Sequence, residues 1–202
     1  MNNQLLLLRA YLELLKQKML DPSFNAYFQK VVNAAQSISS MIRFMSEYEE
    51  VGIDTPVWQD CHALADTAAK DVPLGTIVIK NDLPSGAEVF ADPLIVKVFY
   101  NLMDNAIRHG REITAIRFSL QESGEDHLIL CEDDGDGVPA EEKEQIFSRD
   151  FGRNTGLGLF LSREVLAITG ITIRENGEPG KGARFEILVP KDAFRFSAMK
   201  QK

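Results

Sequence analysis

The sequence predicts an α+β protein in which an N-terminal antiparallel helical hairpin precedes an α/β sandwich, with helices on one face of a sheet. Three observations support this fold class. Apolar residues recur at helical spacings over residues 3–50, short apolar runs beyond residue 76 predict strands, and residues 52–56 break both patterns. We therefore expect two regions, residues 1–52 and 56–195, joined by a short linker.

The N-terminal region is predicted to contain two helices. Asp21 and Pro22 mark the start of the second, because Asp caps helices and Pro is favoured at the first helical position. The apolar residues of the first helix, spaced three and four apart, are Leu5, Leu8, Leu12, Leu15 and Met19. Those of the second helix form a heptad seam of Phe24, Phe28, Val31, Ala35, Ile38, Ile42 and Met45.

A single hairpin leaves part of each apolar stripe in contact with water. Two copies are therefore expected to pair as a four-helix bundle, which makes the protein a homodimer through its N-terminal helices. A hairpin that lies on the C-terminal region of its own chain is the alternative.

The second region is predicted from alternating helix and strand patterns. Asp92 and Pro93 repeat the cap-and-proline signal and start a helix that runs to His109. Residues 123–126 form the turn of a β-hairpin. In all, we expect helices at 60–70, 92–109 and 157–169, and strands at 76–81, 87–91, 114–121, 127–133, 171–175 and 183–189.

The composition limits the classes of partner. The chain has 202 residues, of which 45% are hydrophobic, and its formal net charge of −8 gives a pI near 5.0. Nucleic acids and anionic membranes carry phosphates that repel such a chain, so we expect no general affinity for either. Any phosphate must be bound locally.

The cysteines and the leucine run bear on the compartment. Cys61 and Cys131 lack zinc-site spacing, so we expect neither a disulfide framework nor a Cys-based metal site, and a cytoplasmic setting is the default. Arg9 and Glu13 interrupt the leucines of residues 5–8 long before the about 20 apolar residues that a membrane span needs. This portion is expected to make no membrane contact, while a membrane anchor elsewhere in the parent protein stays open.

The first chemical motif is NLMDNAIRHG, residues 101–110. Asn101, Asn105 and Arg108 share one stripe of the predicted helix, beside the apolar stripe that faces the sheet. Asn is a poor helix former, so two in mid-helix require a compensating role. An amide oxygen suits Mg²⁺ beside nucleotide phosphates, and Arg108 is placed to bind phosphate oxygens. Taken alone, the motif also fits a solvated polar face.

The second motif is EDDGDGVP, residues 132–139, which follows an apolar strand. It supplies a carboxylate at the strand end and two glycines, Gly135 and Gly137, where the chain turns or lets a ligand approach the backbone. A carboxylate held in a pocket accepts a hydrogen bond from an exocyclic amine such as that of adenine. A calcium loop is excluded, because Lys143 stands where that loop requires a bidentate Glu.

The third motif is TGLGLFLSREV, residues 155–165, which places Gly156 and Gly158 at the start of an apolar helix. Free backbone N–H groups and the positive end of the helix dipole make such a start a site for phosphate. A tight turn without a ligand is the alternative. The sequence contains neither a Walker-type phosphate loop nor a Rossmann fingerprint.

The order of these motifs, closed by GKGARFEILVP, resembles the ATP-binding domain of sensor histidine kinases of two-component systems, within the wider family that includes gyrase and the Hsp90 chaperones. The likeness covers essentially the whole chain. It implies that residues 1–52 form the dimerisation and histidine phosphotransfer hairpin and that residues 56–195 form the catalytic domain. The implied cofactors are ATP and Mg²⁺.

The resemblance also assigns roles by position. Asn101 and Asn105 match the N box, with Asn105 as the Mg²⁺ ligand, while Arg108 stands where the family usually has a phosphate-binding Lys. Asp133 matches the Asp that binds adenine, and His109 belongs to the pocket edge. The other implied nucleotide-binding residues are Gly135, Gly137, Phe147, Phe151, Gly156, Leu157, Gly158 and Leu159.

Two positions bear on the reaction that the resemblance implies. ATP-hydrolysing relatives place a Glu one helical turn before the metal-binding Asn, where it activates water. Here that position is Asn101, whose amide cannot take a proton, so transfer to a protein acceptor is favoured. Only residues 152–155 separate Phe151 from Gly156, which implies a short lid over the nucleotide.

The phosphoacceptor is the main departure from the family. NNQL, residues 2–5, resembles the end of the H box, whose His would precede Met1, and His62, His109 and His127 lie elsewhere. We therefore expect no autophosphorylation of this chain at the usual site. Truncation within the H box is favoured over loss of the chemistry.

The function implied by the resemblance is that of a sensor histidine kinase core. It would transfer the γ-phosphoryl group of ATP to a histidine outside this chain, for relay to an aspartate of a response regulator receiver domain. One alternative is a protein-serine kinase of the anti-sigma type, which lacks a dimerising hairpin. Another is a nucleotide-binding scaffold or pseudokinase that acts through helix-mediated partner binding.

Overall fold

Five strands form the main sheet of the C-terminal region. The computed structural model describes residues 12, 15, 22–149 and 157–197. The sheet order is β2-β4-β5-β7-β6, in which β2 is parallel to β4 and the other pairs are antiparallel. The strands are β2 (Val78–Asn81), β4 (Ala115–Ser123), β5 (Asp126–Asp133), β6 (Thr172–Glu175) and β7 (Arg184–Val189).

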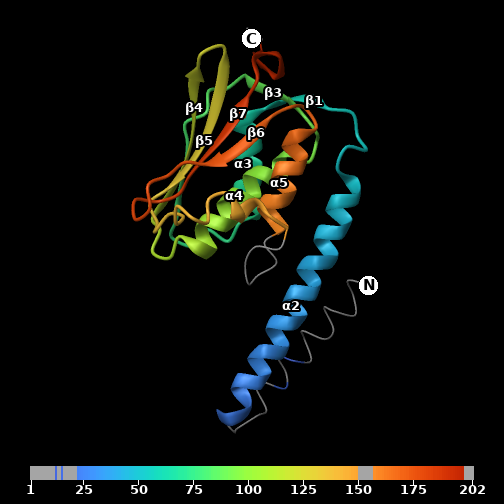
Figure 1. The fold of residues 1–202 in the computed structure, drawn as a ribbon, viewed down its shortest axis with the longest axis vertical. Helices are drawn as coiled ribbons and strands as arrows, with labels where there is room; N and C mark the ends of the chain where they lie inside the picture. Colours follow the sequence, from blue (N-terminus) through green and yellow to red (C-terminus); the bar gives the residue numbers. More distant parts are fainter. Residues whose placement is uncertain (1–11, 13–14, 16–21, 150–156, 198–202) are drawn as a thin grey trace.

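Three helices cover one face of this sheet (Figure 1), namely α3 (Cys61–Asp71), α4 (Ile95–His109) and α5 (Leu157–Ala167). The apolar stripe of α4 is buried as predicted, and Phe99 stacks on Phe118 of β4 with ring centroids 5.3 Å apart. Asp60 caps α3 by accepting a hydrogen bond from the Ala63 N–H group. The predicted fold class, an α+β sandwich with helices on one face of a sheet, is therefore confirmed.

A second, small sheet is not anticipated by the sequence analysis. It consists of β1 (Val57–Asp60), β3 (Ala87–Ala91) and β8 (Phe194–Phe196), with β3 antiparallel to both neighbours. Strands of three to five residues are too short to display a period of two, which is why only β3 was expected as a strand. Two short 3₁₀ turns, Gln145–Phe147 and Lys191–Ala193, complete the described elements.

The start of α4 also differs from the prediction. The helix begins at Ile95, three residues after Asp92, and its N-cap position is Leu94. Asp92 is only 1% exposed, and its carboxylate accepts the N–H groups of Leu94 and of Gly52. The Asp therefore joins the linker to α4, and it does not cap the helix.

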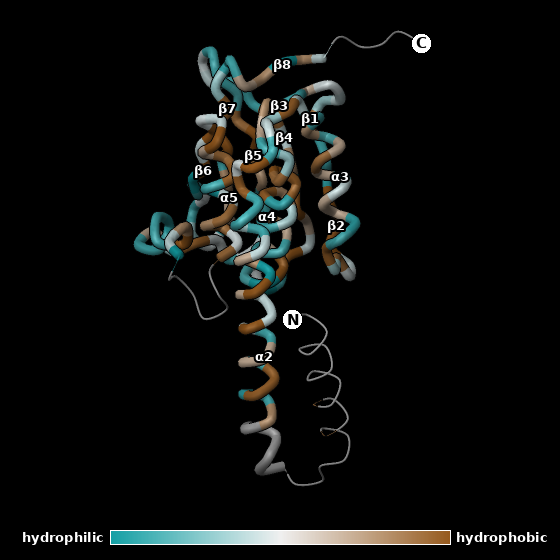
Figure 2. The backbone as a smooth tube through the Cα atoms, turned by 90° about the vertical axis from the view of Figure 1, so that its right-hand side faces the viewer, coloured by the Kyte–Doolittle hydropathy of each residue, from teal (hydrophilic) through white to brown (hydrophobic). Residues whose placement is uncertain are grey.

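The long helix α2 (Pro22–Glu50) extends away from the α/β body (Figures 1 and 2) and begins at the predicted proline. Leu12, which is helical, forms a buried cluster with Phe28, Val32 and Ala35, as an antiparallel hairpin requires. Most of the predicted first helix, including Leu5, Leu8 and Met19, and the side chain of Phe24 lie outside the described residues. In the described part of the chain, no helix combines the length and the apolar character needed to cross a bilayer.

The C-terminal end of α2 packs on the α/β body. Phe44 and Tyr48 both contact the ring of Phe160 in α5, with centroids 6.1 Å apart in each case. Glu47 forms an ion pair with Lys97 of α4 at 3.1 Å. Three kinds of contact, aromatic, ionic and the linker hydrogen bond to Asp92, therefore hold the two regions together.

We expect Asp92→Ala to lower the free energy of unfolding by about 2 to 4 kcal/mol, because it leaves two backbone N–H groups without their acceptor. Urea unfolding followed by the fluorescence of the single tryptophan, Trp58, measures this change. Asp54→Ala, at an exposed position in the same linker, is the control and should change the stability little. Equal stabilities of the two variants would contradict the role given to Asp92.

Candidate functional site

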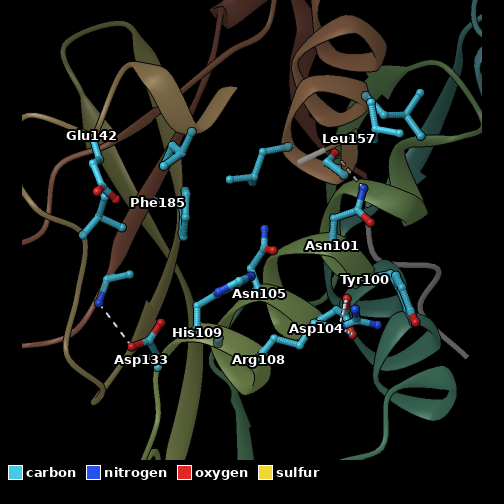
Figure 3. A pocket seen from close by; sticks show the side chains of 18 of the residues that line it. Tyr100, Asn101, Asp104, Asn105, Arg108, His109, Asp133, Glu142, Leu157 and Phe185 are labelled. Carbon is cyan, nitrogen blue, oxygen red and sulfur yellow. Dashed lines mark hydrogen bonds and ion pairs between the residues drawn. The ribbon is translucent and has the colours of Figure 1, made fainter. Parts of the chain in front are cut away.

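A cavity of about 1040 Å³ lies between α4, the start of α5 and the loop that follows β5. Its size fits the upper range of small-molecule sites. In Figure 3, Asp133 lies on one side of the cavity and Asn101 on the other, with Asn105 and His109 between them. Residues from three separate sequence motifs therefore face one space.

The end of β5 places the carboxylate of Asp133 in the cavity wall. Its Oδ1 atom accepts the N–H groups of Gly135 at 2.9 Å and Ala183 at 3.1 Å. Burial raises the pKa of Asp133, and these two hydrogen bonds act in the opposite direction. With Oδ1 occupied, the described residues donate no hydrogen bond to Oδ2, so this atom remains available as an acceptor.

The neighbouring carboxylate, Asp134, has a different role. It accepts hydrogen bonds from the hydroxyl and N–H groups of Thr114 and from the N–H group of Ala115. The hydrogen bond from the Thr114 hydroxyl is the main reason that the pKa of Asp134 is lowered to about 2. Asp134 thus joins two loops at the surface and is not part of the cavity lining, whereas Asp133 is.

Glycines allow the backbone segments around Asp133 to touch. A Cβ atom on Gly182, whose φ is +98°, would lie 1.9 Å from the Asp133 carbonyl oxygen, and one on Gly137 would lie 2.7 Å from the Gly182 carbonyl oxygen. A Cβ atom on Gly135 would lie 2.5 Å from the carbonyl oxygen of Gly110. These positions admit glycine only, because real Cβ atoms do not approach a backbone so closely.

Asn101 joins α4 to the start of α5. Its Nδ2 atom donates to the Gly158 carbonyl oxygen at 2.9 Å and to the Ser162 hydroxyl at 3.2 Å. A Cβ atom on Gly158 would lie 3.2 Å from Oδ1 of Asn101, so the glycine makes room for this amide. The amide therefore compensates for its poor helix propensity through a contact between helices.

Asn105 lies one turn further along α4 and differs from Asn101 in its hydrogen bonding. Its Nδ2 atom is buried and has no hydrogen-bond partner among the described residues. A buried polar atom without a partner costs about 1 to 3 kcal/mol, so a polar ligand in the cavity would remove a real penalty. The amide can turn over to offer its oxygen instead, which is the ligand atom that Mg²⁺ takes.

Two further predicted residues lie at the cavity edge. Arg108 donates from Nε to the carboxylate of Asp104 at 2.8 Å, and more than half of its side chain is exposed. His109, also exposed, lines the cavity beside it. Because a guanidinium has five N–H donors, Arg108 has donors left for phosphate besides the Nε–H group that Asp104 accepts.

The cavity gathers most of the residues that the sequence singled out. Gly135 packs behind the wall, and Phe147 is buried under the Arg163 guanidinium and against Phe185, so neither lines the cavity. Phe151 and Gly156 lie outside the described residues. The predicted residues in the lining are Asn101, Asn105, Arg108, His109, Asp133, Gly137, Leu157, Gly158 and Leu159.

Other lining residues were missed. Val138, Ile146 and Phe185 make the wall near Asp133 apolar, as a flat aromatic ligand requires. Tyr100 and Asp104 lie on the same face of α4 as Asn101 and Arg108. Helical spacings of three and four could have identified Tyr100 and Asp104. No local sequence pattern identifies Val138, Ile146 or Phe185 as lining residues.

The arrangement suits a purine nucleotide with a metal ion. A single acceptor atom in an apolar wall selects an exocyclic amine, and the unpaired Asn105 amide offers a hard oxygen ligand. The first turn of α5 borders the cavity, since Leu157 and Gly158 both line it, and the N–H groups of a first helical turn lack partners within the helix. The donor set therefore fits a magnesium nucleotide.

Comparison with known proteins agrees with this geometry. A family model described as histidine kinase-, DNA gyrase B-, and HSP90-like ATPase matches residues 91–193. These residues contain α4, β5 with the following loop, α5, and β7 with the preceding loop. The other walls of the cavity come from α2 and α3.

Individual relatives extend the likeness to sensor kinases. The alginate biosynthesis sensor protein KinB of Pseudomonas aeruginosa is 38% identical over 101 residues, which cover 48% of this chain and 17% of KinB. The signal transduction histidine-protein kinase AtoS of Escherichia coli is 28% identical over 202 residues, which cover 93% of this chain and 33% of AtoS. The chain thus spans a third or less of these two relatives.

A solved structure shares the fold. Full-length ShkA in complex with AMPPNP superposes with a TM-score of 0.68 at 19% identity, covering 97% of this chain and 46% of ShkA. Because residues 91–193 make up just over half of the 202 residues and carry the cavity, the chain belongs to the histidine kinase-, DNA gyrase B-, and HSP90-like ATPases, as an ATP-binding domain of the sensor histidine kinase type.

Proposed function

We propose that this chain is the catalytic core of a sensor histidine kinase, which binds ATP with Mg²⁺ and transfers the γ-phosphoryl group to a histidine outside this chain. The phosphoryl group then passes to an aspartate of a response regulator receiver domain. The observation that carries the proposal is the convergence of Asp133, Asn105 and the start of α5 on one cavity. Because the donor is ATP, a cytoplasmic location is part of the proposal.

Adenine recognition is assigned to Asp133. Hydrogen bonds from the Gly135 and Ala183 N–H groups hold Oδ1, so the carboxylate keeps one orientation and presents Oδ2 to the exocyclic amine. The surrounding wall, which includes Val138 and Phe185, excludes water from the ring. A fixed acceptor in an apolar wall discriminates strongly, because a ligand without the amine leaves a buried carboxylate unpaired.

The phosphates are assigned to the opposite side of the cavity. Asn105 would hold the metal, and Arg108 and the first N–H groups of α5 would bind phosphate oxygens. When bound, Mg²⁺ would neutralise part of the negative charge of the phosphates. The chain's own residues contribute mainly position and charge, which is the usual division of labour in phosphoryl transfer.

Transfer to a protein acceptor is favoured over hydrolysis. A hydrolase needs a base near the γ-phosphate to activate water. The amide of Asn101, at the position where hydrolysing relatives carry Glu, cannot act as a base, and its Nδ2 is already engaged with Gly158 and Ser162. This residue holds two helices together and leaves any bound water without activation.

The proposed dimer is supported by the surface of α2. The predicted seam divides into two rows, of which the row with Phe28 and Ala35 is buried against Leu12. The other row, Val31, Ile38 and Met45, is 49%, 51% and 44% exposed in the single chain. A second copy of the hairpin, packed on this row, would complete the four-helix bundle formed by residues 1–52, next to the catalytic domain of residues 56–195.

We expect Asp133→Ala to weaken ATP binding about 10- to 100-fold, because it removes a charged acceptor that neutral backbone groups cannot replace. Isothermal titration calorimetry with ATP and Mg²⁺ measures the dissociation constant. Asp134→Asn is the matched control, since this neighbouring carboxylate is not among the cavity-lining residues and its affinity should equal that of the wild type. Equal weakening by both substitutions would remove Asp133 from the proposed site.

The affinity for ATP should also depend on pH. The amine binds the ionised carboxylate, so affinity is complete above the pKa of Asp133 and is lost as the pH falls through it. Because burial raises this pKa, the loss begins above the ordinary Asp value of about 3.9. Calorimetry from about pH 7 down to about pH 4 tests this with Asp133→Asn, which should lack the transition. Parallel curves for the two proteins would show that another group titrates.

Dimerisation is tested at the exposed row of α2. Ile38→Glu introduces a charge where two apolar surfaces are proposed to meet, so the mass in light scattering should fall from twice 22.6 kDa towards 22.6 kDa. Gln36→Glu adds the same charge at an exposed polar position on the same helix and should leave the dimer intact. A wild-type mass of 22.6 kDa, or dissociation by both variants, would contradict this interface.

A further inference from the structure

The cavity extends beyond the matched family region to the long helix. Ser40, Arg43, Phe44 and Glu47 of α2 line it together with Asn101 and Asn105, and all four lie outside residues 91–193. Arg43 belongs to none of the three sequence motifs. The helical hairpin therefore supplies part of the wall of the proposed nucleotide site.

Two contacts just after Arg43 in the sequence hold α2 against the α/β body. Glu47, one turn later, pairs with Lys97 of α4 at 3.1 Å, and Phe44 packs on Phe160 of α5. Asn101 lies one turn after Lys97, and both Asn101 and Arg43 line the cavity. Beyond the ion pair, α2 and α4 therefore border the same cavity, and Arg43 lines it together with Asn101 and the start of α5, where the phosphates are proposed to bind.

Arg43 differs from the other cations of the cavity. Among the described lining residues, four are Lys or Arg, and Arg43 is the one of these without an ion pair. The other three pairs are Lys97 with Glu47 at 3.1 Å, Arg108 with Asp104 at 2.8 Å and Arg111 with Asp136 at 3.0 Å. A carboxylate already offsets part of the charge of each of these three cations, whereas no carboxylate among the described residues pairs with the exposed Arg43.

We propose that Arg43 binds the terminal phosphate of the nucleotide from α2, so that a triphosphate, and not a diphosphate, joins the helical hairpin to the catalytic domain. This inference rests on the proposed function and names the residue by which the site senses the γ-phosphate. A guanidinium is suited to the task, because its planar donors bind two phosphate oxygens at once. The contact involves no covalent step.

The test compares two nucleotides on the same protein. Calorimetry with Mg²⁺ and either AMPPNP or ADP gives the two dissociation constants for wild type, Arg43→Ala and Arg43→Lys. We expect Arg43→Ala to weaken AMPPNP binding about tenfold and to leave ADP binding unchanged, with Arg43→Lys between them. Gln36→Ala, on the same face of α2 two turns away and outside the cavity, is the control and should alter neither constant.

A second measurement reports on the hairpin itself. Amide hydrogen exchange in the part of α2 around Phe44 should be slower with AMPPNP than with ADP in the wild type, and this difference should vanish in Arg43→Ala. No effect of Arg43→Ala, or an equal loss for both nucleotides, overturns the proposed γ-phosphate contact while leaving the nucleotide site in place. A wild type that binds neither nucleotide overturns the proposed function and this inference together.

Discussion

The cavity depends on the close approach of two backbone segments at the end of β5. The chain after Asp133 and the chain around Gly182 touch so closely that no side chain fits between them. This contact brings the Ala183 N–H group to the Asp133 carboxylate, which also receives the Gly135 N–H group. The two hydrogen bonds offset part of the cost of burying a charge, and that cost is still visible in the raised pKa.

The opposite wall rests on a polar contact between helices. Asn101 bonds to Gly158 and Ser162, and Ser162 is itself only 1% exposed. A partly buried amide with both partners in place favours one arrangement of α4 and α5, since a shift would break these hydrogen bonds. The Nδ2 atom of Asn105, one turn later, has no partner among the described residues. Under the proposed function, two identical residues on one stripe therefore divide into a structural role and a ligand-binding role.

The sequence predicted the elements in which apolar residues recur at regular spacings. Long periodic segments such as α2 and α4, and the β4–β5 hairpin with its turn at residues 123–126, were expected nearly at their observed bounds. The small sheet was not predicted because its strands hold too few residues to show alternation. In addition, β3 and β8 pair across more than a hundred positions of sequence, as between Glu88 and Arg195. The start of α4 was misplaced because Asp92 bonds across the linker, which a local cap rule does not include.

Site residues were predictable where they lie close together in the sequence, at spacings that place them on one face of a single helix. The stripe of Asn101, Asn105 and Arg108 is a property of one helix, and the structure keeps it on the cavity side. Phe147 was assigned to the nucleotide by position alone, yet its ring contacts Arg163 and Phe185 in the interior. Arg43 stands in a heptad helix 58 residues before Asn101, and only the folding of α2 onto α5 brings the two to one cavity. The spacing of neighbouring residues in the sequence cannot predict such a contact.

The side-chain contacts of α2 with the α/β body are individually modest in energetic terms. The Glu47–Lys97 pair is partly exposed and contributes about 0 to 1 kcal/mol, and each aromatic contact of Phe160 adds about 0.5 to 1.5 kcal/mol beyond its buried area. One charged hydrogen bond to phosphate is of the same order. Under the proposed contact of Arg43, nucleotide binding and hairpin docking therefore strengthen each other by the same factor, because coupling between two equilibria is reciprocal. The modest strength of the resident contacts is what allows a single phosphate group to shift the arrangement.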